Sequence, residues 1–544
     1  MARIWSKAVT FFVALLIPFA TFFSSWAQPV LTRKGNSAQL IVNGKPFLVL
    51  GGELGNSSAS SLEYMLPIWP KLKQMHVNTI LSPVYWELME PEEGKFDFTL
   101  IDGSILNARK NNLKIIVLWF GSWKNSMSCY APAWVKTNQN RFPRAQKKTG
   151  DGVEILSAFS ANNLSADVKA FKVLMKHIRD IDSNDQTVIM VQVENEIGML
   201  TEAREYTAEA NAAFKREVPV ELMDHLQKNK AMLVPELKDR WAARGSIIKG
   251  NWEMTFGKGL ETDEIFQAYY YAKYTNAVAQ AGKAVYAVPM FVNAALNYKN
   301  VKPGEYPSAG PLPHLMDIWQ AAAPAIDMLL PDFYNPYFRL YNDLYIRRNN
   351  PLFIPEILFG PSVEAKVFYA IGHYNAIGFS PFSVETTEKP EEEPLGKSYR
   401  ILEQLAPEIL QFGGTGKIDG ALLDTQVRQQ DIRMGTYHLS VSHYYSLGWV
   451  PEATKTEFPM AGAIFIQTGD DEFIVAGTGI VVTFTTEDKF NPIVGILQTD
   501  EGEYINGKWT RGRRMNGDQD HQGRHVQIAS GEWGIQHVKL YKYK

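Results

Sequence analysis

The chain has 544 residues, and its 55 Lys and Arg against 58 Asp and Glu give a formal net charge of −3. Hydrophobic residues make up 45% of it and charged residues 21%, which is typical of a globular protein with ample apolar surface to bury. This composition excludes an intrinsically disordered chain. It also argues against a nucleic-acid partner, because no basic excess exists to neutralise phosphates.

The segment 1–27 is predicted to be a secretory signal peptide. A short basic start precedes an apolar run over 8–23, and Ser-Trp-Ala at 25–27 places small residues at a candidate cleavage site. The run is short for a membrane span, and an uncleaved anchor is the alternative. We therefore expect an exported protein, periplasmic or extracellular, with no membrane insertion after cleavage. The single Cys129 allows no internal disulfide.

Eight short apolar runs follow, most of them separated by helical patterns. The runs are 47–52, 78–85, 114–120, 187–193, 286–292, 325–330, 352–354 and 376–379. Near-continuous apolar strands between helices are typical of a parallel sheet covered on both faces. Eight such units predict an α/β fold, a closed (β/α)8 (TIM) barrel. An open doubly wound sheet is the alternative, although the turn after the first run lacks the glycine spacing of a dinucleotide site.

Two further parts extend the predicted barrel. The connection after the fourth strand is too long for one returning helix, and its excess at 201–262 has a helical pattern. Loops after barrel strands lie on the catalytic face, so this insertion is a candidate wall or lid, with plain helical decoration as the alternative. After the Gly-rich stretch 413–416, alternation and turn signals predict a C-terminal antiparallel β-sandwich. The expected domains are a barrel over 28–413 and a sandwich over 414–544.

Carboxylates stand where two of the predicted strands end. Glu194, Asn195 and Glu196 directly follow the fourth run, and Glu356 ends the seventh. Glu194 and Glu196 should share a strand face, with Asn195 opposite, unless the chain turns there. Buried carboxylates are costly without a purpose, and the carboxyl ends of barrel strands carry catalytic groups. Two carboxyl groups cleave a glycosidic bond, one as acid and the other as nucleophile or base. The sequence therefore predicts a glycosidase, with ion pairing at the barrel rim as the alternative.

Three segments carry a family resemblance: VQVENEIG at 191–198, PLFIPE at 351–356 and YWELMEPEEGKFDF at 85–98. In these the chain resembles glycoside hydrolase family 35, the retaining β-galactosidases of clan A, whose fold is a (β/α)8 barrel followed by β-sandwich domains. Bacterial members can carry a single C-terminal β domain. The resemblance implies that Glu196 is the acid/base and Glu356 the nucleophile, and that Asn195 binds the sugar 2-hydroxyl. At Pro83 and at Lys124-Asn125 the chain departs from the animal members, which puts the identity of the sugar in question.

Other residues near strand ends are candidate contacts for an oligosaccharide substrate. Together with Glu194 and Asn195 they are Glu53, Asn56, Trp86, Glu87, Trp119, Trp123, Lys124, Asn125, Tyr334 and Asn335. We expect Trp119, Trp123 and Trp252 to border the sugar and Tyr334 and Asn335 to hydrogen-bond the nucleophile. For Asn56 a helix cap, and for Trp86 wall packing, are the alternatives. Since the chain has neither H-E-x-x-H nor a Cys/His cluster, no metal and no cofactor are expected.

The sequence as a whole predicts a retaining, exo-acting β-galactosidase that removes terminal β-linked galactose from oligosaccharides such as plant cell-wall xyloglucan side chains. The two carboxyl groups should lie about 5–5.5 Å apart, as retention requires. Burial and the negative Glu356 should raise the pKa of Glu196. Another clan A retaining glycosidase, an arabinosidase or a glucosidase, and a non-catalytic carbohydrate-binding barrel are the alternatives. The sequence does not indicate the oligomeric state.

Overall fold

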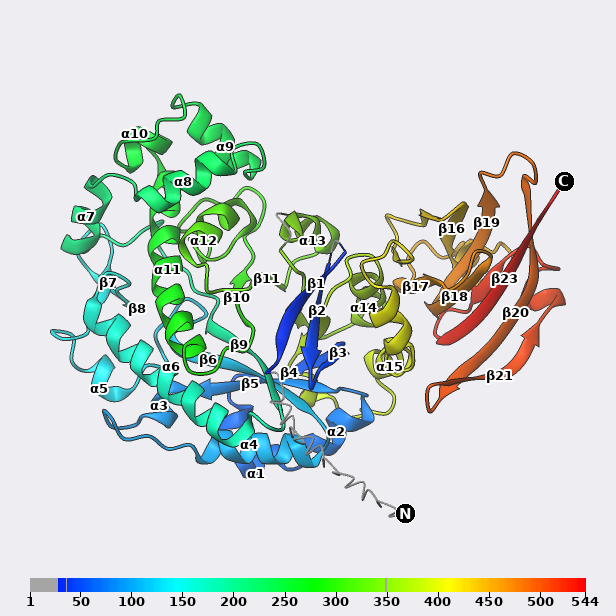
Figure 1. Cartoon of the computed structure of the whole chain (residues 1–544), viewed down its shortest axis with the longest axis horizontal. Helices are drawn as coiled ribbons and strands as arrows, with labels where there is room; N and C mark the ends of the chain where they lie inside the picture. The colour runs from blue at the N-terminus through cyan, green and yellow to red at the C-terminus, as the bar shows by residue number, and fades with distance from the viewer. Residues whose placement is uncertain (1–27, 36, 348–349) are drawn as a thin grey trace, which may run out of the picture.

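The computed structural model describes residues 28–35, 37–347 and 350–544, so the predicted signal peptide at 1–27 lies outside the described residues. Within the described part of the chain, no helix combines the length and apolar character needed to cross a bilayer. The chain forms a barrel and a separate pair of sheets, which stand side by side in Figure 1.

Eight parallel strands close into a barrel, which confirms the predicted fold and excludes the open sheet. In order around the barrel they are β4 (Val49–Glu53), β5 (Thr79–Tyr85), β6 (Lys114–Lys124), β9 (Val188–Asn195), β10 (Met290–Ala295), β11 (Met328–Phe333), β12 (Ile354–Leu358) and β13 (Gly378–Phe382). Every predicted apolar run supplies one strand. Most strands continue past the run to the polar residues that follow it, so these residues are held by the sheet.

Helices cover the outside of the barrel. The longest are α4 (Thr99–Lys110), α6 (Ala161–Asp182), α11 (Leu260–Lys283) and α15 (Pro394–Phe412), with the shorter α1 (Leu62–Met65), α2 (Ile68–Gln74), α3 (Trp86–Met89), α5 (Ala133–Lys136), α12 (Met316–Ala322), α13 (Phe338–Tyr345) and α14 (Val363–Gly372). Helix α6 shows why these segments are helical. Its buried Phe171, Leu174, Met175 and Ile178 recur at the spacing of one helix face, and Ser160 caps its start by accepting from the Asn163 amide.

Two small sheets lie outside the barrel and were not predicted. Strands β1 (Val30–Lys34), β2 (Ser37–Val42) and β3 (Lys45–Phe47) form an antiparallel sheet, and β7 (Arg144–Gln146) pairs with β8 (Gly152–Leu156). The Asn43-Gly44 turn joins β2 to β3 with φ of 49° and 73°. Glycine and asparagine adopt this left-handed conformation most easily, which is why these two residues form the turn of the hairpin.

The predicted helical insertion is present as α7 (Ala208–Lys215), α8 (Val220–Lys228), α9 (Pro235–Ala242) and α10 (Trp252–Phe256). These helices lie beside α11 and α12, at the top left of Figure 1. Asp317 on α12 holds them, accepting from the Val234 amide at 2.8 Å and contacting His225 at 3.4 Å. The insertion therefore packs on the outer helices as a layer with its own buried side chains.

The C-terminal part is an antiparallel β-sandwich, as predicted. One sheet has the order β14 (Ile418–Leu423), β17 (Ala461–Gln467), β18 (Glu472–Thr478), β23 (Gly534–Tyr543), β20 (Ile493–Ile505), β21 (Lys508–Met515). The other has the order β15 (Gln429–Met434), β16 (Tyr437–His443), β19 (Ile480–Thr486), β22 (Val526–Ile528). Along β16 buried and half-buried side chains alternate, because one face meets the core between the sheets and the other meets solvent.

The sandwich docks on the barrel through α14 and α15, which lie between the two parts in Figure 1. Glycines allow this approach, because a Cβ at Gly462 would lie 2.3 Å from the carbonyl oxygen of Ala365 and one at Gly372 would lie 2.7 Å from that of Asp419. Ile464 and Ile474 of the sandwich belong to the same buried apolar cluster as the barrel. The two domains therefore share one continuous core.

Candidate active site

Four buried carboxyl groups meet at the carboxyl ends of the barrel strands. Glu53 ends β4, Glu196 follows β9, Asp332 lies in β11 and Glu356 lies in β12, and each is at most 5% exposed. Asp332 and Glu356 are direct partners in the register of β11 and β12. One oxygen each of Glu196, Asp332 and Glu356 lies within 4.8 Å of the others. Among the described residues, the oxygens of these three are close enough together to coordinate a cation.

The backbone turns sharply at the end of β9 and aims Glu196 into this cluster. Glu194 and Glu196 both have left-handed φ, 61° and 45°. Such conformations are unfavourable for residues other than glycine and persist only where the surroundings hold them. Here the Glu196 amide donates to Asn293 Oδ1 at 3.0 Å, and the Ser126 amide donates to the Glu196 carbonyl at 3.0 Å. The side-chain amide of Asn293 in turn donates to Asp332 at 2.6 Å, which connects three neighbouring strands.

Burial and neighbouring charge set the proton affinity of Glu196. Burial raises its pKa to about 7, and the charge of Glu356 acts in the same direction. Lys124 and a hydrogen bond from Asp332 oppose this rise. The pKa of Asp332 lies well above its ordinary value, because it is fully buried beside the other carboxylates. Burial therefore favours the protonated forms of both Asp332 and Glu196.

Burial and the neighbours of Glu356 act on its pKa in opposite directions. Burial raises its pKa, but the Lys124 ammonium and hydrogen bonds from Tyr334 and Glu53 all favour its charged form. The Tyr334 hydroxyl donates to Glu356 Oε1, which is the predicted contact. Burial and the charge of Glu356 hold the pKa of Glu53 well above its ordinary value. Lys124 is the cation that opposes the rise in pKa of Glu53, Glu196 and Glu356.

Lys124 and Asn195 lie next to each other at the strand ends, paired across β6 and β9. The Lys124 side chain is 4% exposed and its ammonium lies 5.1 Å from the centre of the Phe120 ring. The Asn195 amide is fully buried, and among the described residues neither of its polar atoms has a hydrogen-bond partner. An unpaired buried amide costs about 1–3 kcal/mol. A ligand hydroxyl that bonded Asn195 would remove this cost.

The tryptophans expected to border the sugar are instead packed into the protein. Trp119 Nε1 donates to Asp167 on α6, and Trp86 Nε1 donates to Glu90, each at 2.9 Å. Trp123 packs edge-on against Tyr274 of α11, with ring centres 4.7 Å apart. All three indoles are fully buried. Trp119 and Trp123 leave β6 on the side of the helices, opposite to Lys124, because alternate residues of a strand face opposite ways.

The sequence prediction was also wrong about the position of Trp252. It is fully buried in the insertion, where it contacts Phe256, Phe266 and Tyr269 at ring-centre distances of 6.2, 5.3 and 5.7 Å. An indole this size gains most by filling the space between α10 and α11. It therefore serves the core of the insertion and offers no face to a sugar.

Three other candidates lie away from the cluster or bond elsewhere. Glu194 was expected to share a face with Glu196, but its Oε2 accepts from the Trp123 amide at 2.8 Å and its raised pKa reflects burial beside Asp167. It therefore points toward α6. Glu87 is half-exposed and pairs with Lys136 at 3.5 Å, and Asn125 is exposed in the turn after β6.

The two remaining asparagines have open polar atoms near the strand ends. Asn335 was expected to bond the nucleophile, but its Oδ1 accepts from the Tyr337 amide at 3.0 Å, while within the described residues its buried Nδ2 has no partner. Asn56 keeps a buried Oδ1 that is likewise without a partner in the described chain, and Ser57 is the cap of the short helix that follows. Its loop is fixed by Glu385 Oε1, which accepts from Gly55 and Ser58 at 2.7 and 2.6 Å.

Asp332 is the member of the cluster that the sequence prediction missed. Its position directly after an apolar run, in the stretch Asp-Phe-Tyr-Asn-Pro, has the same form as those of Glu196 and Glu356. That position was the only available signal, because a lone aspartate after a strand also commonly caps a turn.

Comparison with known proteins relates the barrel to β-galactosidases. Residues 65–244 match the Glyco_hydro_42 family, described as "Beta-galactosidase", and residues 395–527 match a "Domain of unknown function (DUF5597)". The β-galactosidase of Xanthomonas manihotis is 27% identical over 210 residues, which cover 37% of this chain and 32% of that protein. The human β-galactosidase-1-like protein 3 is 28% identical over 191 residues, 34% of this chain and 26% of that protein. The chain thus spans a third or less of the length of these two curated relatives.

The chain also aligns with parts of solved structures. The β-galactosidase from Bacillus circulans sp. alkalophilus aligns with a TM-score of 0.46 and 15% identity, over 67% of this chain and 57% of that chain. The catalytic domain of the β-amylase from Paenibacillus polymyxa aligns with a TM-score of 0.45 and 12% identity, over 65% and 98%. The family match, together with the two curated relatives, makes the barrel similar to β-galactosidase-type glycoside hydrolases.

Proposed function

We propose that this protein is a retaining β-galactosidase that removes terminal β-linked galactose from oligosaccharides. The observation that carries the proposal is the pairing of Glu196 with Glu356, which each bring an oxygen within 4.8 Å of the other at the carboxyl ends of the barrel strands. Retaining glycosidases place their two carboxyl groups about 5–5.5 Å apart, whereas inverting enzymes need about 6.5–9.5 Å to admit a water.

In this proposal Glu356 attacks the anomeric carbon while Glu196 gives its proton to the departing glycosidic oxygen. The products of this step are the free aglycone alcohol and a galactosyl ester on Glu356. The ester carries no charge, so the pKa of Glu196 falls, since the charge of Glu356 had raised it. Glu196 then takes a proton from water, and the resulting attack releases galactose and restores both carboxyl groups. We assign the bond to the sugar 2-hydroxyl to Asn195, because its buried amide has no partner among the described residues.

The finer parts of the proposal rest on the sequence. The VQVENEIG and PLFIPE segments support assignment to glycoside hydrolase family 35, and plant cell-wall glycans such as xyloglucan side chains are the proposed substrates. The N-terminal segment 1–27 supports export to the periplasm or the exterior. Lys124 stands among the carboxylates, at a position where the animal enzymes have a different sugar-contacting residue. An arabinosidase or glucosidase of the same clan is therefore the second candidate.

The test compares Glu196→Ala with wild type on two β-galactosides. A substrate with a good aryl leaving group needs no proton donor, so the variant should lose far less activity on it than on a natural galactoside. Added azide should attack the galactosyl-enzyme in place of water, which restores turnover and gives a β-galactosyl azide as the product. Glu87→Gln, which removes a strand-end carboxylate outside the cluster, should behave as wild type. If the wild type hydrolyses only an aryl arabinoside or an aryl glucoside, the proposed sugar, galactose, is wrong. No turnover of any aryl glycoside would leave a non-catalytic barrel.

A further inference from the structure

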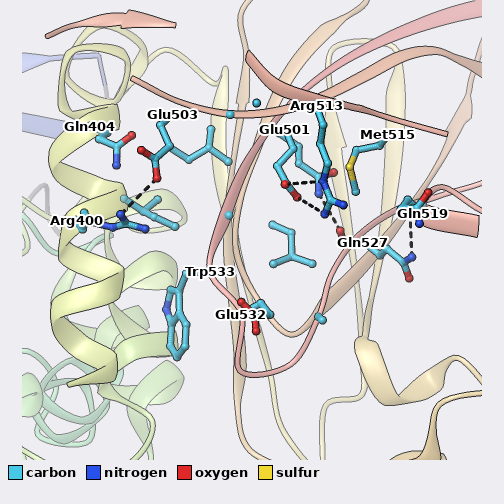
Figure 2. Close-up of a pocket in the computed structure, with 18 of the residues that line it drawn as sticks. Arg400, Gln404, Glu501, Glu503, Arg513, Met515, Gln519, Gln527, Glu532 and Trp533 are labelled. Atoms are coloured by element: carbon cyan, nitrogen blue, oxygen red, sulfur yellow. Dashed lines mark hydrogen bonds and ion pairs between the residues drawn. The ribbon is translucent and has the colours of Figure 1, made fainter. Parts of the chain in front are cut away.

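A cavity of about 480 Å³ lies between the barrel and the sandwich, away from the catalytic cluster. Helix α15 forms one wall with Arg400 and Gln404, and strands β20 and β21 form the other. Figure 2 shows these walls facing each other, with Trp533 and Glu532 between them. Its volume is within the roughly 300–1,000 Å³ typical of small-molecule sites. Nothing in the proposed mechanism uses it.

The indole of Trp533 is fixed in this cavity. Its Nε1 donates to Ser398 Oγ at 2.9 Å, and Ser398 in turn donates to the Glu364 carbonyl at 2.8 Å. The Lys397 ammonium lies 4.9 Å from the ring centre. Trp533 nevertheless stays half-buried and lines the cavity, unlike the fully buried tryptophans of the barrel. A preset, partly open indole offers an apolar surface to a ligand without losing side-chain freedom on binding.

Four of the charged groups around the cavity form two ion pairs. Arg400 contacts Glu503 at 3.3 Å, and Arg513 contacts Glu501 at 3.0 Å. Together with Glu532, the lining holds three carboxylates against two guanidinium groups. Such a lining is a poor site for phosphates, because its carboxylates outnumber its guanidinium groups. It presents donors and acceptors side by side, which suits hydroxyl groups that donate and accept at once.

Amides add to this pattern. Gln404 Oε1 accepts from the Tyr504 amide at 2.8 Å, which leaves its NH₂ group to meet a ligand. Gln536 also lines the cavity, with its Nε2 bonded to the Gln527 carbonyl at 2.9 Å and its orientation thereby fixed. An aromatic face surrounded by amides and ion-paired side chains matches a pyranose ring, which is apolar on its C–H face and polar at its rim.

We propose that this cavity binds a neutral stretch of polysaccharide backbone and so holds the enzyme on its polymeric substrate. The site requires both parts of the protein, because α15 supplies one wall and the sandwich the other. The choice of xyloglucan as the polymer rests on the proposed function. The site itself is separate from the catalytic cluster and is tested separately.

The experiment is native gel electrophoresis of the full chain through a matrix containing xyloglucan stripped of its galactose. This probe lacks the sugar that the catalytic site is proposed to cut, so retardation reports the backbone alone. Wild type should be retarded, and Trp533→Ala should bind at least about tenfold more weakly, as expected for a central aromatic contact. Glu532→Ala changes an exposed side chain without disturbing the core and should also weaken binding several-fold. Aryl β-galactoside hydrolysis should stay at the wild-type rate in both.

Phe490→Ala is the matched control. Phe490 is an aromatic residue of the same domain, 79% exposed and outside the cavity lining, so its loss should not change retardation. No retardation of wild type, or equal retardation of wild type and both cavity variants, would overturn the inference. An equal loss with Phe490→Ala would place binding elsewhere and would overturn it as well. Retardation without any galactosidase activity would instead remove the proposed function and leave this site standing.

Discussion

Removing the buried ammonium of Lys124 should move the whole pH–rate profile to higher pH. Lys124 lowers the pKa of both Glu356 and Glu196, and its side chain is 4% exposed, so solvent screens it little. An opposite charge this near lowers a carboxyl pKa by about 1–3 units, and one unit corresponds to about 1.4 kcal/mol. In Lys124→Gln the pKa of Glu356 rises, so the acidic limb, where Glu356 must ionise, moves up. The pKa of Glu196 rises too, so the alkaline limb, where Glu196 must keep its proton, also moves up.

The assay is kcat/KM for an aryl β-galactoside across about pH 4 to 9, because this parameter reports the ionisations of the free enzyme. We expect both limbs to shift upward by at least about one unit, with a loss of about tenfold per unit on the acidic side. Lys124→Arg should keep the wild-type limbs. Lys136→Gln, which removes a cation paired with Glu87 at 3.5 Å outside the cluster, is the control. A uniform loss of activity with unmoved limbs would refute the electrostatic role and make Lys124 a sugar contact only.

Three further substitutions test particular contacts. Tyr334→Phe removes a hydrogen bond to a charged acceptor worth about 1.5–3 kcal/mol, so kcat/KM should fall about 10- to 150-fold and the acidic limb should rise; an unmoved limb would contradict this. Trp252→Ala should lower the free energy of unfolding in urea by about 3–5 kcal/mol and should leave the ratio of the oligosaccharide rate to the aryl galactoside rate unchanged. A selective loss of activity on oligosaccharides would instead support the lid hypothesis. Gly462→Ala should destabilise by about 1–3 kcal/mol in thermal unfolding, since its Cβ would lie 2.3 Å from the Ala365 oxygen, while Gly448→Ala, with open space around it, should be neutral.

The barrel strands could be predicted because each is apolar on both faces. A run such as 187–193 has few interpretations other than a buried strand, and the polar residues after it then fall at the carboxyl edge. The same uniformity hides which face each residue takes. In β6 the sequence could not tell that Lys124 faces the mouth while Trp119 and Trp123 face the helices. An amphipathic strand would have revealed this alternation, and a strand buried on both sides does not.

The side-chain contacts between strands could not be predicted from the sequence either. Glu196 depends on Asn293, almost a hundred positions later, and Asn293 depends on Asp332. No local pattern in the sequence connects these three side chains. The left-handed turn at Glu194 and Glu196 also overrides the alternation that put both carboxylates on one face. What could be predicted was which strand ends carry most of the acids, and what could not was which side chains of neighbouring strands hold these acids in place.

The continuous core between α14 and the six-stranded sheet limits where the chain can be truncated. A chain ended at Gly413 would uncover the surfaces of α14 and α15 that Ile464, Ile474 and Ile535 now cover. Large exposed apolar patches drive association, so the isolated barrel should precipitate or recruit chaperones when it is made. The sandwich is thus a folding partner of the barrel, and enzymes engineered by exchanging it would need the glycine contacts at 372 and 462 transplanted along with it.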